Sequence, residues 1–164
     1  MASPAQTQRT LMVFTLAGQS CAIPLKSVRE VVPMAQLARP PGLPALLEGF
    51  LNLRGEAVPV VRLRRLFGLP EASPGLYTPM VVLKGREGPL ALLVDEVSGV
   101  LSASEEAGLP VQEGHAFNDC VEAEVVLDGR AVHLLSTDRL LLEQERRRIA
   151  ELQVVAQRRL SDLG

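Results

Sequence analysis

The chain has few aromatic residues: Phe, Trp and Tyr make up 3% of its 164 residues, and tryptophan is absent. Single-stranded nucleic-acid binders stack bases on aromatic side chains, so this shortage disfavours that class of function. The net charge of −2 also lacks the basic footprint of a nucleic-acid-binding domain. We therefore expect no nucleic-acid partner. Because hydrophobic residues still make up 47% of the chain, we expect a core of Val, Leu, Ile and Ala.

Long hydrophobic runs are also missing. No stretch approaches the ~20 consecutive apolar residues that a membrane-spanning helix requires. The apolar run 11–16 follows Arg9 but is too short for the hydrophobic region of a signal peptide, and Gly18 interrupts it. We expect a soluble, cytoplasmic protein with no direct membrane insertion.

Cysteine and histidine, the usual residues of metal sites and nucleophilic catalysis, number two each. Cys21 and Cys120 have neither CxxC nor metal-ligand spacing, which predicts two reduced apolar thiols and no metal. The run 115–120 does hold a His, an Asn and a Cys, but in thiol hydrolases these groups come from distant parts of the chain. No P-loop or GxGxxG motif occurs. We expect no enzyme and no cofactor; a small cysteine hydrolase using Cys120 is the alternative from another class.

What the sequence does contain is a series of short apolar runs separated by Gly and Pro. These runs predict ten strands, at residues 11–16, 20–23, 27–32, 50–53, 57–61, 77–83, 90–94, 96–101, 122–127 and 131–135. The segment 73–75, Ser-Pro-Gly, falls in the middle of the series. Five strands on either side of it favour small barrels or a sandwich built from two similar halves.

The segment 49–61 is the most informative, because it places two apolar runs on either side of Arg54 and Gly55. Gly55 suits a tight turn, and Pro59 predicts an edge strand or a bulge because it cannot donate to a ladder. The pattern places the charged side chain of Arg54 on a turn between two buried strands. Such an arginine is either paired with a carboxylate or presented to a partner.

The same segment resembles a known family. Asn52-Leu-Arg-Gly55 followed by Val58-Pro-Val-Val61 is similar to the signature of CheW-like domains, the coupling proteins of bacterial chemotaxis arrays. Matching motifs flank it in the same order, at residues 14–16, 22–31 and 92–101. The resemblance covers about residues 10–143, and several separated motifs in order are more specific than one.

The resemblance implies a mainly β fold of two small five-stranded, SH3-like β-barrels packed over a shared apolar core, with a C-terminal α-helix. It implies a CheW-like domain of two barrel subdomains at 8–143, followed by a helical extension at 144–164. The implied function is a non-enzymatic adaptor in a cytoplasmic chemosensory array. Its partners would be the tip of a methyl-accepting chemoreceptor and the regulatory domain of a CheA-type histidine kinase.

The resemblance also implies a groove that receives the receptor tip. The matching positions carry one charged pair and five apolar residues: Glu30 and Arg54, with Met12, Leu25, Val28, Val31 and Val97. The alternative for the charged pair is a surface ion pair worth at most ~1 kcal/mol. The alternative for each apolar residue is ordinary core. No residue is assigned to the kinase contact.

One position departs from the family pattern. The family usually carries an acidic residue after Pro-Val-Val, and this chain has Arg62 there. The departure, together with the long C-terminal helix, leaves open a diverged paralogue that caps or dampens an array.

The C-terminal segment 139–160 contains no Gly or Pro, and 136–138 offer N-cap candidates. One apolar stripe runs along it, formed by Leu142, Ile149, Leu152 and Ala156, which predicts an amphipathic helix. The stripe itself is short of apolar residues after Leu152, since Arg159 falls on its seven-residue register. We therefore expect the first turns to dock on the second barrel and the final turns to project.

Overall fold

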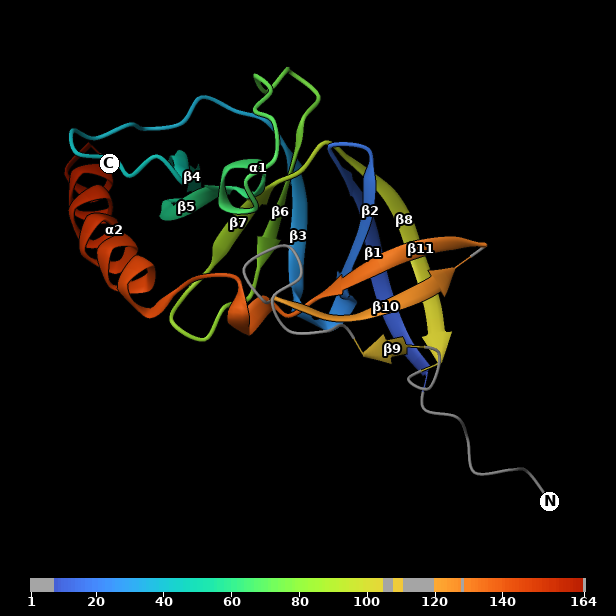
Figure 1. Cartoon of the computed structure of the whole chain (residues 1–164). Coiled ribbons are helices and arrows are strands. Elements are labelled where there is room, and N and C mark those ends of the chain that lie inside the picture. The colour runs from blue at the N-terminus through green and yellow to red at the C-terminus, as the bar shows by residue number, and fades with distance from the viewer. Residues whose placement is uncertain (1–7, 105–107, 111–119, 128, 164) are drawn as a thin grey trace.

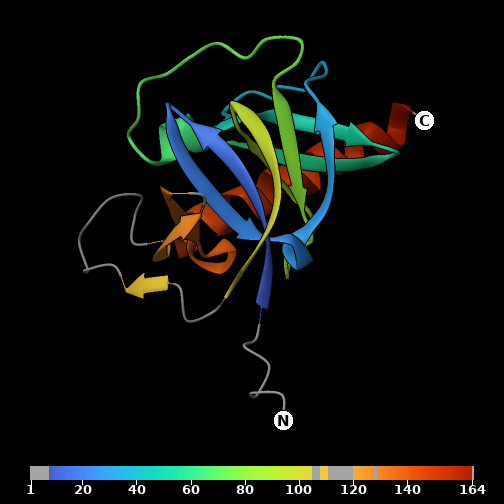
Figure 2. The same ribbon diagram turned by 90° about the vertical axis from the view of Figure 1, so that its right-hand side faces the viewer.

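The protein is mainly β, with two sheets and a long C-terminal helix (Figure 1). The computed structural model describes residues 8–104, 108–110, 120–127 and 129–163. The helix α2 (Glu143–Leu163) lies at the opposite end of the molecule from β8 (Glu96–Ser104) (Figure 1). Seen from the side of β8, α2 lies behind the strands (Figure 2).

The first sheet has six strands, which come from both ends of the chain. In spatial order β8-β1-β2-β11-β10-β9, they are β8 (Glu96–Ser104), β1 (Gln8–Leu16), β2 (Gln19–Pro24), β11 (Arg130–Leu135), β10 (Val121–Leu127) and β9 (Gly108–Pro110). The second sheet has five strands from the middle of the chain. In spatial order β3-β6-β7-β5-β4, they are β3 (Val28–Pro33), β6 (Pro79–Leu83), β7 (Leu90–Leu93), β5 (Glu56–Arg62) and β4 (Leu47–Leu53).

All ten expected strands are present, and β9 is an additional one. The expected division into two halves at residues 73–75 is wrong. The strand β2 pairs in parallel with β11, through Cys21 with His133 and Ala22 with Leu134. This pairing joins the first two strands to the last ones. The five-stranded sheet is therefore nested in sequence: its strands β3–β7 lie between β2 and β8 of the six-stranded sheet. Each sheet still contains five of the ten expected strands, and the six-stranded sheet gains the short β9.

Each sheet has an apolar core of its own, and a third core joins them. The five-stranded sheet encloses Leu51, Val58, Val60, Met80, Val82 and Ala91, and the six-stranded sheet encloses Leu11, Val13, Ala22, Val125, Val132 and Leu134. The shared core between the sheets contains Phe14, Ile23, Leu47, Val61, Val81 and Leu92. Side chains alternate between faces along a strand, so each sheet can serve both its own core and the shared one.

The shared apolar core expected from the sequence is confirmed, but barrel closure is not. The ladders between described residues leave β3 and β4 as the two end strands of the five-stranded sheet. They leave β8 and β9 as the end strands of the other sheet. Closure into SH3-like barrels stays a prediction. The strand β5 lies inside its sheet rather than at an edge, and Pro59 falls just before the stretch 60–62 that pairs with β7.

The helix α2 begins later than the sequence pattern indicates. A 3-10 turn at Thr137–Arg139 precedes it. The Glu145 carboxylate then accepts a hydrogen bond from the Leu142 N–H at 2.7 Å, which is one half of a capping box. The stripe predicts burial of Leu142, yet this residue is 53% exposed because it lies just before the helix.

The helix docks on β4 and β5 of the five-stranded sheet. Its Ile149, Leu152 and Ala156 are buried in the shared core, and Leu160 packs against that core. The prediction that only the first turns dock, and on the later strands of the chain, is therefore wrong. The helix α2 covers the β4–β5 hairpin, and this contact extends to the final turns of the helix.

Candidate functional site

The candidate site begins at the turn between β4 and β5. Leu53 and Glu56 are paired, so Arg54 and Gly55 form a two-residue hairpin loop. Both have positive φ, 50° and 90°, as a type I′ turn requires. Asn52 supports the turn by accepting a hydrogen bond from the Gly55 N–H at 2.9 Å. Because a positive φ is uncommon for a residue with a side chain, the surroundings must hold Arg54 in place.

Arg54 makes a two-point ion pair with Glu30 of β3, as the sequence predicts. Its Nη1 and Nη2 donate to Oε1 and Oε2 of Glu30 at 3.2 and 2.5 Å. Beside this pair, Arg29 Nη1 donates to Glu56 Oε1 at 2.9 Å. The strand β3 is one end of the five-stranded sheet and the β4–β5 hairpin is the other. Both ion pairs therefore connect the two ends of this sheet.

The Glu30–Arg54 pair is accessible, with the Arg54 side chain 64% exposed and the Glu30 side chain 27% exposed. The hydrogen bond from Arg54 holds the pKa of Glu30 below its ordinary value, and Glu30 raises the pKa of Arg54 in return. Both groups are therefore charged at neutral pH. Exposed ion pairs contribute little to stability, because water solvates both charges. A fixed guanidinium can still offer its remaining donors to a partner.

The five apolar residues of the predicted groove lie along one border of the shared core. Leu25, Val28 and Val97 are half-buried and pack against this core, and Met12 is buried within it. Val31 is 40% exposed and lies on the same face of β3, because its cross-strand partner in β6 belongs to the shared core. We call these five residues the apolar border.

A bulge in β3 separates the apolar border from the ion pair. The bulge lies between Val28 and Glu30, and it leaves Glu30 paired with Val82. Val82 belongs to the core of the five-stranded sheet, so Glu30 faces the opposite side of β3 from Val28 and Val31. The two parts of the predicted site meet only at the free edge of β3. A partner would have to cross this edge to contact both.

A second arginine–carboxylate site, which the sequence patterns do not predict, centres on Glu48. This residue is 4% exposed. Its carboxylate accepts hydrogen bonds from Arg62 Nε and from Arg39 Nη2, the latter at 2.6 Å, and its backbone oxygen accepts one from Arg39 Nε at 3.0 Å. Arg62, the position that departs from the family pattern, thus neutralises a buried carboxylate. A Glu inside the apolar run 46–50 is the sequence signal, because a buried charge needs a partner.

The backbone around Glu48 explains why it is buried. The strand β4 has a bulge between Leu47 and Gly49, and its outer edge pairs with Ala38 through two hydrogen bonds to Phe50. A side chain at Gly49 would bring its Cβ to 2.8 Å from the Ala38 oxygen, so only glycine permits this approach. The strand β4 and the loop that contains Ala38 and Arg39 together enclose Glu48.

Asp95 ties the two sheets together. Arg64 donates to it from Nε at 3.0 Å and from Nη2 at 2.6 Å, and the Ala17 N–H donates to it at 2.9 Å. Arg64 belongs to the short helix α1 (Leu63–Leu66) after β5, whereas Ala17 lies in the turn between β1 and β2. The hydrogen bond to Asp95 also raises the pKa of Arg64.

A cavity of about 670 Å³ lies over these buried and half-buried ion pairs. Its charged lining consists of Arg39, Arg62, Arg64, Arg65, Glu48, Glu71 and Asp95. Each of the four guanidiniums already has a carboxylate partner in this chain. The charged groups that line the cavity are thus paired with one another within this chain.

The two cysteines do not form a nucleophilic site. Cys21 and Cys120 are not joined in a disulfide, and both are fully buried in the shared core. Burial, with Cys120 close by, raises the pKa of Cys21 to about 12. A nucleophilic cysteine needs an accessible thiolate, so the geometry disfavours a hydrolase using Cys120. The remaining residues of that alternative, within 111–119, lie outside the described residues.

Across the described ranges, no three His, Cys, Asp or Glu side chains are grouped so that they could hold a metal ion. None of the described helices is both long enough and apolar enough to span a membrane.

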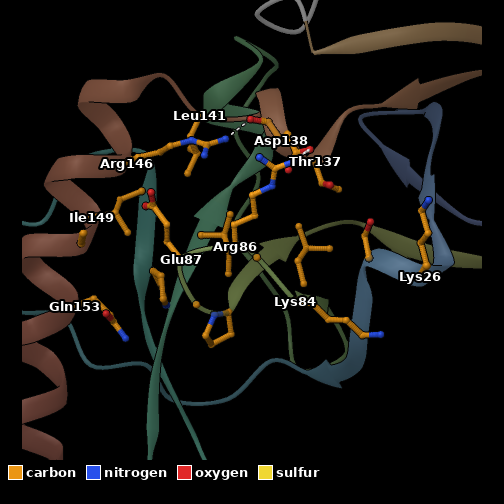
Figure 3. Close-up of a pocket in the computed structure, with 18 residues that line it drawn as sticks. Lys26, Lys84, Arg86, Glu87, Thr137, Asp138, Leu141, Arg146, Ile149 and Gln153 are labelled. Carbon is orange, nitrogen blue, oxygen red and sulfur yellow. Dashed lines mark hydrogen bonds and ion pairs between the residues drawn. The ribbon is translucent and has the colours of Figure 1, made fainter.

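A groove of about 420 Å³ lies between α2 and the turn that joins β6 to β7 (Figure 3). Its apolar lining includes Leu83, Leu90, Leu141 and Ile149, and its basic lining comprises Lys26, Lys84, Arg86 and Arg146. Arg86 lies 3.6 Å from the Asp138 carboxylate, and Arg146 donates to the Asp138 backbone oxygen. None of the seven predicted site residues lines this groove. The sequence does not predict it because its residues come together only in the fold.

Known proteins match most of this chain. The family model of the CheW-like domain matches residues 10–145. A probable chemotaxis protein CheW from Rhizobium etli is 28% identical over 142 residues, covering 85% of this chain and 92% of that protein. The chemotaxis protein CheW of Bacillus subtilis is 25% identical over 143 residues, covering 86% of this chain and 92% of that protein.

A solved structure shares the fold. The crystal structure of the scaffolding protein TtCheW from Thermoanaerobacter tengcongensis matches with a TM-score of 0.75 at 24% sequence identity, covering 79% of this chain and 90% of that one. The family match ends at residue 145, whereas α2 continues to Leu163. Nearly all of α2 therefore lies beyond the matched region.

Proposed function

Because this chain belongs to the CheW-like domain family, we propose that it is a non-enzymatic adaptor of a chemosensory array. It couples the tip of a methyl-accepting chemoreceptor to the regulatory domain of a CheA-type histidine kinase. The similarity to CheW chemotaxis proteins over 92% of their length supports this role, as does the fold shared with a scaffolding protein. In this proposal the protein acts in the cytoplasm, clustered in arrays.

The proposal divides the chain into a coupling domain of two barrel subdomains at 8–143 and a helical extension at 144–164. Control of the kinase follows from contacts that differ between two states of the array. The protein itself supplies surfaces, and it transmits a signal by binding its two partners with different strength in each state.

The exposed Glu30–Arg54 pair is the observation that carries the receptor contact. Arg54 is held on a rigid turn and fixed by a two-point ion pair, yet 64% of its side chain is exposed. An arginine held in this way loses little freedom when it binds a partner, which favours affinity. The apolar border lies just across the edge of β3, and a helical hairpin can place apolar side chains on such a surface.

A diverged paralogue that caps or dampens an array is the second candidate. Two features leave it open: Arg62 is basic where the family is usually acidic, and α2 extends beyond the family match. The two candidates differ in the kinase: a coupling protein supports receptor control of kinase activity, whereas a capping protein binds receptors and lowers that control.

The test is calorimetric binding to the cytoplasmic fragment of a receptor encoded in the same genome. We expect Arg54→Glu to weaken binding about tenfold while the melting temperature stays unchanged, because interface arginines are frequent hot spots. Arg65→Glu is the matched control, since Arg65 is also exposed and ion-paired but lies on α1. Unchanged receptor affinity in Arg54→Glu would sink the proposed receptor site.

A further inference from the structure

Two glutamines on α2 bind the backbone next to the Arg54–Gly55 turn. Gln157 accepts a hydrogen bond from the Ala57 N–H at 2.9 Å through Oε1, and its Nε2 donates to the Gly55 oxygen at 3.0 Å. Gln153, one helical turn earlier, donates from Nε2 to the Ala57 oxygen at 3.3 Å. Residues four apart lie on the same face of a helix, so the two amides act side by side.

These backbone groups need partners because the sheet does not supply them. The strand β7 pairs with β5 only at Val60–Arg62, and β5 begins four residues earlier, at Glu56. Ala57 is 2% exposed, and an unpaired N–H or C=O at such a position is costly. A side-chain amide carries both a donor and an acceptor, so it can replace a neighbouring strand. The helix thus continues the ladder where β7 stops.

This contact lies on the hairpin that carries the candidate site. Gly55 is the second residue of the turn and Arg54 is the first, so the turn is held by Asn52 from within and by Gln157 from α2. The same helix buries Leu152 and Ala156 in the shared core, which fixes the position of its amides. Displacing α2 would release the backbone that keeps Arg54 in its left-handed conformation.

We infer that α2 is a clamp on the Arg54–Gly55 turn, and that Gln153 and Gln157 are positioning residues for the receptor contact. The inference rests on the proposed function of the Arg54 site. The family match ends at residue 145, so both glutamines lie in the part of the chain beyond it. The C-terminal helix therefore sets receptor affinity through the hairpin, by way of the two amides that contact its backbone.

The test compares full-length variants Gln157→Ala and Gln153→Ala/Gln157→Ala with Gln144→Ala, a control at an exposed position near the start of α2. Hydrogen exchange of the Ala57 amide reports the clamp, with the Val60 amide as a reference for the sheet. Calorimetry with the receptor fragment and with the kinase regulatory domain reports binding. We expect faster exchange at Ala57, receptor binding weakened about fivefold as for a lost hydrogen bond, and unchanged kinase binding.

A further variant, Gln157→Glu, keeps the acceptor for the Ala57 N–H but removes the donor to the Gly55 oxygen. It should keep the Ala57 amide protected and still weaken receptor binding. This variant separates the clamp from global unfolding, because an intact Ala57 hydrogen bond requires a folded hairpin.

The outcomes distinguish the clamp from the site. Unchanged exchange at Ala57 in Gln157→Ala would overturn the clamp directly. Faster exchange with unchanged receptor affinity, while Arg54→Glu still weakens binding, would overturn the positioning role of the glutamines and leave the proposed site intact. If neither Arg54→Glu nor Gln157→Ala alters receptor affinity, the proposed site fails and the positioning role fails with it.

Discussion

The β4–β5 hairpin carries an arginine–carboxylate site at each end, and the two sites differ in burial. At the turn, Arg54 holds Glu30, whose side chain is 27% exposed. At the far end, Arg62 and Arg39 hold Glu48, whose side chain is 5% exposed. The chemistry is the same in both: guanidinium groups donating to a carboxylate.

Burial gives the same chemistry two different roles. The carboxylate of Glu48 has lost its water, so it depends on both guanidiniums, and breaking such a contact leaves a charge without compensation. The carboxylate of Glu30 keeps access to water, so its contact with Arg54 adds little to stability. The buried site holds the fold, and the exposed site is available for a partner.

The largest effect is expected at the buried site. Arg62→Asp, which restores the acidic residue usual in the family, would place a second carboxylate against Glu48. We expect a loss of about 2–4 kcal/mol in the free energy of unfolding, because a buried charge then loses one partner and gains a repulsion. Urea unfolding measures this loss, with Arg65→Asp as an exposed control. Equal midpoints for the two variants would contradict the structural role of Arg62.

An intermediate effect is expected from exchanging charges. Glu30→Arg with Arg54→Glu should recover part of the receptor affinity lost in Arg54→Glu alone, because the exchanged side chains can still pair. The matching exchange at the buried site, Glu48→Arg with Arg62→Glu, should not recover stability, since Arg39 would then face a second cation. Calorimetry follows the first pair of variants, and urea unfolding follows the second. Recovery at the buried site would remove the contrast between the two sites.

The smallest effect is expected from pH. The pKa of Glu30 is lower in the folded chain than its ordinary value of 4.5, so its contribution to stability is present above that value. It is lost as pH falls below 4.5 and through the lower folded pKa. We expect an NMR titration of the Glu30 carboxyl to give a midpoint below 4.5, and Arg54→Ala to move it back toward that value. A midpoint that does not respond to Arg54→Ala would show that the ion pair is absent in solution.

Local patterns predicted much of the fold. Alternating apolar runs bounded by Gly and Pro located ten of the strands, because each run carries its own burial pattern. The turn at Arg54 and its pairing with Glu30 also followed from sequence, the first from Gly55 and the second from a family resemblance. The turn depends only on a short segment of sequence, and the pairing depends on one matched position.

Other features depend on contacts that no local pattern encodes. The parallel pairing of β2 with β11 joins residues more than a hundred positions apart, so the strand series suggested two halves instead of a nested sheet. The partners of Glu48 come from a covering loop and from the end of β5, and only the fold brings them together. The apolar stripe of α2 identified the helix but not the surface that receives it.

The nested topology has a consequence for synthesis. The ribosome releases β1 and β2 first, yet their neighbours β8 and β11 begin at Glu96 and Arg130. The five strands β3–β7 have all their ladder partners by Leu93, so this sheet can pair while the rest of the chain is still being made. Contacts between distant segments form slowly because the intervening loop must close first. The N-terminal hairpin must therefore wait with an unpaired edge, and the nascent chain is most exposed to aggregation during that interval.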